Sequence, residues 1–204
     1  MSQILSKLVE FLPNLISFIA GFVIAIFAEP VRRFFFKPNL NLEFDENKGC
    51  VSGTFEVNKE GGKIADARYI RVKVTNTTKI IAKNCRAYLI NIEKWDGKDN
   101  FMPTGYYDSI QLAWSCQGWM DRWRGLHICK GVNQYVDVLV TRNTSEAFDP
   151  QIMCKPFRYL KLFKEKGKFL FTTQVSADRA DPKIIKLEFD WNGTWDGFVV
   201  KRRK

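Results

Sequence analysis

The chain has 204 residues, of which 46% are hydrophobic and 14% aromatic, and its formal net charge is +10 at pH 7. This hydrophobic content excludes intrinsic disorder as the main state, and the length suits one folded domain with a short additional segment. The excess of Lys and Arg predicts a basic surface that attracts anionic lipid or nucleic acid, although a solvated surface without any partner explains it as well.

Near the N-terminus, an uncharged apolar run occupies residues 11–28, between Glu10 and Glu29. A bilayer core of about 30 Å requires roughly 20 helical residues, so the run predicts one transmembrane α-helix. We divide the chain into a tail and transmembrane helix (1–29), a basic and aromatic juxtamembrane segment (30–38) and a folded domain (39–204). A cleaved signal peptide and a buried core helix of a soluble protein are the alternatives.

Three small residues recur every fourth position within this run, namely Ser17, Gly21 and Ala25. They share one stripe of a helix, where small side chains let a second helix approach closely. The stripe predicts a homo-oligomer that packs through the transmembrane helix, but small residues are also common in such helices without a packing role.

The charges around the run predict its orientation. Arg32, Arg33 and Lys37 follow it, whereas Lys7 is the one basic side chain before it. Lys and Arg are retained on the cytoplasmic side, so we expect a single-pass inner (plasma) membrane protein of bacterial type with a cytoplasmic C-terminal domain. On that side, anionic lipid would also attract the basic end of the chain, which consists of Lys201, Arg202, Arg203 and Lys204.

The chain has five cysteines, an odd number without a CxxC pair, and its one histidine is His127. This set lacks the spacing of a zinc site, and free thiols suit a reducing cytoplasm. We therefore predict free cysteines, no metal and no cofactor.

Apolar residues alternate with polar ones along most of the folded domain, which predicts an all-β fold with about nine strands and no soluble helix. The expected strands are residues 40–44, 51–57, 70–75, 85–90, 110–114, 136–140, 169–175, 185–191 and 195–200. The first two are expected to form a hairpin, and Asn192-Gly193 predicts a two-residue hairpin turn between the last two. Periodicity does not decide between strand and helix for residues 157–163.

Residues 67–95 read ARYIRVKVTNTTKIIAKNCRAYLINIEKW, a strand, an Asn-containing turn at 76–78 and a second strand that opens with A-x-N-C. This segment resembles immunoglobulin-like β-sandwich modules of the cell-adhesion-related type. The resemblance implies an antiparallel immunoglobulin-like sandwich. Such modules share a scaffold without sharing a function, so it implies the fold alone.

A poorly periodic stretch, residues 115–129, combines aromatic and basic side chains: Trp119, Arg122, Trp123, Arg124 and His127. Loops held by a rigid sheet often carry binding surfaces, and aromatic rings beside arginines stack on bases or other rings. We predict that these residues bind a partner. The alternative is that the tryptophans fold back over the core and that His127 is structural.

No catalytic motif is visible, so we do not expect an enzyme. The leading prediction is a membrane-anchored binding module whose cytoplasmic β-sandwich recognises a protein or small ligand near the inner leaflet. The alternative is a ligand-sensing membrane effector that oligomerises through its helix and perturbs the bilayer, as in some prokaryotic defence systems.

Overall fold

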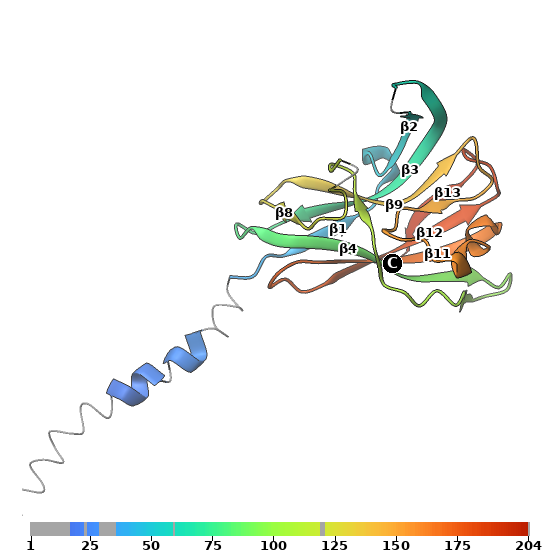
Figure 1. Cartoon of the computed structure of the whole chain (residues 1–204). Coiled ribbons are helices and arrows are strands. Elements are labelled where there is room, and N and C mark those ends of the chain that lie inside the picture. Colours follow the sequence, from blue (N-terminus) through green and yellow to red (C-terminus); the bar gives the residue numbers. More distant parts are fainter. Residues whose placement is uncertain (1–16, 23, 29–35, 59, 119–120, 204) are drawn as a thin grey trace, which may run out of the picture. The chain divides into compact units, whose positions relative to one another are not determined.

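The computed structural model describes residues 17–22, 24–28, 36–58, 60–118 and 121–203 of the chain (Figure 1). The chain divides into two compact units, Met1–Lys37 and Pro38–Lys204. We describe each unit separately.

In the first unit, residues 17–22 and 24–28 are helical and exposed. No helix within the described part of the chain is both long enough and apolar enough to cross a bilayer. The predicted packing positions Ser17, Gly21 and Ala25 lie in these helical stretches. Residues 11–16 and 23 of the predicted span, together with Arg32 and Arg33, lie outside the described residues.

The second unit is all-β and contains two antiparallel sheets, which confirms the predicted all-β class of the folded domain. In the first sheet the long strand β3 (Lys63–Asn76) is central. One of its edges pairs with β1 (Leu40–Glu43) and β2 (Val51–Val57), and the other pairs with β9 (Asn133–Arg142). Strand β9 pairs in turn with β7 (Ala113–Trp114) and β10 (Asp149–Pro150).

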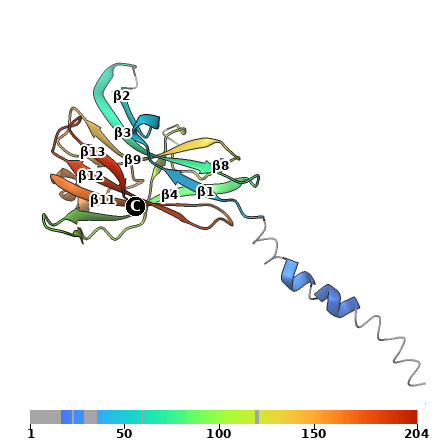
Figure 2. The ribbon, with the colours of Figure 1, turned by 180° about the vertical axis from the view of Figure 1, so that it is seen from behind.

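The second sheet runs in the order β13 (Val199–Arg203), β12 (Lys183–Trp191), β11 (Gly167–Ser176) and β4 (Ala82–Trp95). Three short strands also pair with β4, namely β5 (Phe101–Pro103), β6 (Ile110–Gln111) and β8 (Leu126–Ile128). Figure 2 shows the same strands from behind. The described residues thus form thirteen strand segments rather than about nine, because strands of two or three residues are too short to show a period.

The core joins inward-facing side chains of both sheets, such as Val72 of β3 and Phe171 of β11. Phe148, in the loop before β10, contributes a central ring that lies 5.1 Å from Phe169 and 5.5 Å from Phe189. Aromatic pairs at these separations stabilise a core beyond their buried area.

Two predicted hairpins are wrong. Strands β1 and β2 do not pair with each other, because β3 has 14 residues and accommodates both along one edge. The Asn192-Gly193 turn is also wrong, since β13 begins only at Val199. There the Asn192 side chain accepts a hydrogen bond from the backbone N–H of Thr194 at 2.8 Å, and the Thr141 hydroxyl donates to the Trp195 carbonyl oxygen at 2.7 Å. The first bond shapes the longer loop, and the second ties it to β9 of the first sheet.

The segment 67–95 crosses from one sheet to the other, since β3 and β4 belong to different sheets. Asn76 is fully buried at the crossing, and its amide donates to the carbonyl oxygens of Ile80 at 2.6 Å and Ile128 at 3.0 Å. Residues 157–163, which periodicity left undecided, form two 3-10 helices, η2 (Phe157–Tyr159) and η3 (Leu162–Lys164); a third, η1 (Glu46–Lys48), precedes β2.

All five cysteines are free, as predicted. Cys50 and Cys85 are buried, and Cys116, Cys129 and Cys154 are exposed. Burial raises the pKa of the Cys85 thiol from 9.0 to about 11, so this side chain is a protonated, apolar part of the core at neutral pH.

Candidate functional site

A groove of about 870 Å³ lies on the outer face of the first sheet. Residues of β2, β3, β9 and β10 line it, together with two residues of the 115–129 loop. Its polar part consists of Glu56, Tyr69, Arg122, Arg142, Asp149, Gln151 and Lys155. Exposed apolar side chains border it, among them Phe55, Val57, Ile64 and Met153.

A β-bulge in β9 directs the polar residues to one face. The pairing with β3 passes from Asp137 opposite Arg71 to Leu139 opposite Ile70, so Val138 is an extra residue. Side chains alternate along a strand, and without the bulge Asp137 and position 142 would point to opposite faces. The bulge shifts the alternation by one residue and places both on the face that is opposite to the core.

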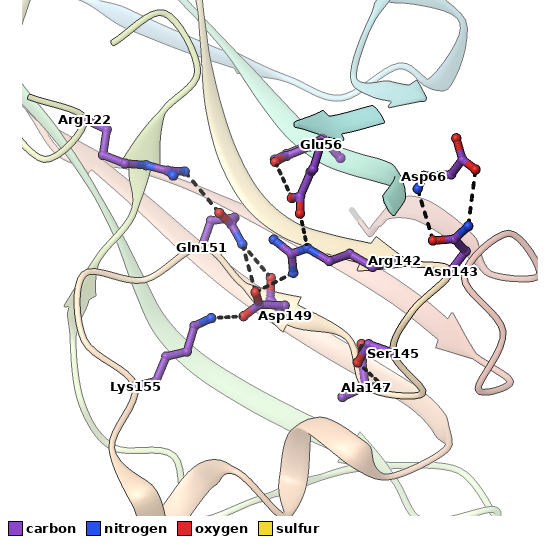
Figure 3. Close-up of polar contacts among 11 residues, drawn as sticks. Glu56, Asp66, Arg122, Arg142, Asn143, Ser145, Ala147, Asp149, Gln151 and Lys155 are labelled. Atoms are coloured by element: carbon purple, nitrogen blue, oxygen red, sulfur yellow. Dashed lines mark hydrogen bonds and ion pairs between the residues drawn. The ribbon is translucent and has the colours of Figure 1, made fainter. Parts of the chain in front are cut away.

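Arg142 lies between two carboxylates at the centre of the groove (Figure 3). Its Nε donates to Glu56 Oε2 at 2.8 Å, and its Nη1 donates to Asp149 Oδ2 at 2.7 Å. The Tyr69 hydroxyl donates to the other oxygen of Glu56 at 3.0 Å, and Lys155 forms an ion pair with Asp149. Strands β2, β3, β9 and β10 are therefore joined by one polar network.

Arg122 extends this network toward the loop (Figure 3). Its Nη2 donates to Gln151 Oε1 at 3.0 Å and lies 3.7 Å from Asp137 Oδ2. Gln151 donates to the Asp149 carbonyl oxygen at 3.2 Å, and Asp137 accepts a bond of 2.8 Å from Arg71 Nε. Multiple hydrogen bonds of this kind hold side chains in fixed positions before any ligand arrives.

The network keeps its groups charged. The hydrogen bond from Arg142 lowers the pKa of Glu56 below its ordinary value. Burial works against the charge of Arg142, but the hydrogen bonds to Glu56 and Asp149 outweigh it and raise the pKa of Arg142. Burial and the neighbouring Glu56 carboxylate raise the pKa of Tyr69 from 10.0 to about 12. At neutral pH the groove therefore presents the charged pair of Glu56 and Arg142 beside the neutral phenol of Tyr69.

Backbone contacts hold the loop against the sheet. The Trp114 N–H donates to the Arg122 carbonyl oxygen at 3.0 Å, and the Gln111 side chain donates to the carbonyl oxygen of Trp123. The Arg122 guanidinium lies 5.2 Å from the centre of the Trp123 ring, within the range of a cation–π interaction. The loop thus adds an arginine and a partly exposed aromatic ring to one side of the groove.

Four of the five loop residues that the sequence singled out lie in the described part of the chain, and of these Arg122 and Trp123 line the groove. Arg124 is exposed and forms an ion pair of 3.0 Å with Asp121. His127 lies on β8 of the second sheet, where its Nδ1 accepts a hydrogen bond of 3.2 Å from the Asn84 N–H. Trp119 is outside the described residues.

The groove also contains residues that sequence reasoning missed, chiefly Glu56, Arg142 and Asp149. Glu56 lies 86 residues before Arg142, Asp149 lies 7 residues after it, and each is an isolated charge near a strand end. The one local signal is Arg142, which ends β9 after the apolar run 138–140 and Thr141.

The basic residues that the sequence singled out at the C-terminus lie on β13, an edge of the second sheet. Lys201 forms an ion pair of 3.2 Å with Glu188, and the Arg203 guanidinium lies 4.7 Å from the centre of the Phe101 ring. Arg202 is exposed, and Lys204 lies outside the described residues. Lys37 belongs to the first unit.

The groove combines cations, carboxylates, an amide and an aromatic ring in fixed positions, an arrangement suited to hydrogen bonding and stacking. No protein-family model matches the chain, and no curated protein or solved structure matches it either.

Proposed function

We propose that the β domain is a binding module whose groove holds a protein segment or small ligand with both a polar and an apolar part. The observation that carries this proposal is a polar network with apolar side chains at its border. Met153 is 60% exposed, although apolar side chains of this size are usually buried. A ligand that covers it would remove apolar surface from water.

The polar part of the groove supports specificity. Arg142 and its carboxylates are already oriented by hydrogen bonds, so a ligand would not need to order them. Trp123 supplies a rigid ring next to a guanidinium, a combination that often dominates binding energy at interfaces.

The test is selection of short peptides from a displayed library on the purified full-length protein, followed by affinity measurements on variants. Trp123→Ala should weaken the affinity for the selected peptides by about tenfold or more, because removal of an interface anchor of this type costs over about 1 kcal/mol of binding free energy. Phe157→Ala is the matched control, since it removes an aromatic ring that is 90% exposed and outside the groove. Equal affinities for both variants would refute the groove as the binding site.

We also propose that residues 11–28 anchor the protein in a membrane as a single helix, with the β domain in the cytoplasm and the Ser17, Gly21 and Ala25 stripe at a helix–helix contact. The uncharged length of the segment and the basic residues after it support this proposal. An immunoglobulin-like arrangement of the two sheets is likewise a proposal, which the resemblance of residues 67–95 supports.

A further inference from the structure

Strand β2 is an open edge of the first sheet. Within the part of the chain that the structure describes, it pairs with β3 alone. The Arg71 N–H donates to the Cys50 carbonyl oxygen at 2.7 Å, which fixes the phase of the ladder. Because backbone groups alternate in direction along an antiparallel strand, Gly53 and Phe55 direct their N–H and C=O groups away from β3. These groups are available to another strand.

The other edges carry features that discourage pairing. Strand β13 is rich in Lys and Arg, β1 has four residues, and the short strands β5 and β10 each end in proline. Charge, shortness and proline are the usual means by which proteins block edge-to-edge association. Strand β2 has seven residues, no proline and one charged residue, Glu56. That carboxylate is already bound by Arg142 and Tyr69.

Strand β2 also exposes apolar surface. Phe55 is 60% exposed, Val57 50%, and Ile64 of the adjoining part of β3 is 56% exposed. This end of the two strands extends beyond the rest of the domain (Figures 1 and 2). Exposed apolar residues on an uncovered edge indicate a contact surface.

We propose that β2 pairs antiparallel with β2 of a second copy of this chain, around a two-fold axis at Thr54. Thr54 is the middle residue of the seven, so this register alone pairs every residue of the strand. Thr54 then faces Thr54 of the partner subunit, a favourable cross-strand pair. The two first sheets join into one continuous sheet across the axis.

The remaining pairs in this register are complementary. Phe55 faces Gly53 of the partner subunit, where the absence of a side chain leaves space for the ring. Val51 faces Val57 of the partner subunit, so apolar residues meet. Glu56 faces Ser52 of the partner subunit, and the one charged residue of the strand therefore avoids its own copy.

Disulfide trapping in the full-length protein tests the register. Cys116, Cys129 and Cys154 are first replaced by serine, since they are the exposed thiols. Thr54→Cys should then give a disulfide-linked dimer under mild oxidation, because directly opposed residues bring their Cβ atoms to about 4.5–5.5 Å. The matched control is Ser52→Cys, on the same face of the same strand. In the proposed register the two cysteines at position 52 would be offset by four residues along the strand, about 14 Å apart, and should not cross-link.

Two further variants in the Thr54→Cys protein test the edge itself. Phe55→Pro removes an N–H that points away from β3, so it should abolish the cross-link while the unfolding temperature is retained. Gly53→Lys fills the space for the partner's ring with a charge and should abolish the cross-link as well. The proposal is overturned if Thr54→Cys stays monomeric, which is the result expected if a strand of a different protein binds the edge of β2 in place of a second copy. It is also overturned if Ser52→Cys cross-links equally well, or if both edge variants still cross-link.

Discussion

At the scale of single residues, Arg142 determines the character of the groove. It holds Glu56 of β2 and Asp149 of β10 on either side of β9, with bonds of 2.8 and 2.7 Å. Removal of one member of a partly buried charged group leaves its partners without hydrogen bonds, which costs more than the intact bond contributes. The binding surface and the stability of the sheet therefore depend on the same side chain.

This dependence predicts a pH effect at Glu56. Its pKa in the folded protein is lowered, chiefly by the bond from Arg142, relative to an ordinary value of 4.5. The stabilisation is therefore complete above about pH 4.5 and is lost as the pH falls through the lower folded value. Glu56→Gln should lower the free energy of unfolding by about 1–3 kcal/mol at neutral pH. The difference from the natural protein should shrink in acid.

Chemical denaturation, repeated at steps of roughly one pH unit between about pH 3 and 7, measures the difference in unfolding free energy between Glu56→Gln and the natural protein. Glu146→Gln, which changes an exposed carboxylate in the loop after β9, is the control. If Glu56→Gln lowers the free energy of unfolding by the same amount at every pH, the role assigned to the ionised carboxylate is contradicted.

The sequence pointed to groove residues only where those residues are close together in the chain. The cluster of Trp and Arg in residues 115–129 pointed to Arg122 and Trp123, which do line the groove. Their partners Gln151 and Asp137 are 29 and 15 residues away from Arg122 along the chain, and no spacing rule links them. Only the folded sheet brings such charges together.

At the scale of elements, the alternation of β9 determines which face Arg142 occupies. Deletion of both Val138 and Leu139 would leave Asp137 and Arg142 an odd number of positions apart without a bulge, and would turn Arg142 toward the core. Deletion of Val138 alone removes only the extra residue, so Leu139 stays opposite Ile70 and Arg142 stays on the outer face. We expect the double deletion to unfold or to lose far more stability than the single deletion.

Thermal unfolding followed by circular dichroism compares the two variants. If the double deletion costs no more than the single deletion, the register of β9 is not what positions Arg142.

Periodicity predicted the long strands well, because each has one face in the core and alternates accordingly. It did not predict the pairing of β1 and β2 with β3, since pairing depends on the length of β3 rather than on either strand's own pattern. The Asn192-Gly193 turn failed for a related reason. Bonds to Thr141 and Arg68, far along the chain, hold the loop around Trp195 and Asp196 in place of a tight hairpin.

At the scale of the whole molecule, the proposed anchor predicts a fixed topology. A reporter that is active only in the cytoplasm, fused to the C-terminus, should be active, and the protein should sediment with membranes. Activity of an external reporter instead would reverse the orientation. Recovery of the intact full-length protein in the soluble fraction would refute the anchor.

The order of the strands also bears on how the domain forms. Strand β4 pairs with β11, and Leu89 meets Thr173 across 84 residues of chain; Val72 of β3 meets Val136 of β9 across 64. Neither sheet has its central pair until the later half of the polypeptide has left the ribosome. Such distant contacts give slow folding, typically within about milliseconds to seconds. Throughout synthesis, β4 must wait for β11 and β3 must wait for β9, although β1 and β2 can already pair with β3, and this interval exposes unpaired strand edges of the nascent chain to aggregation.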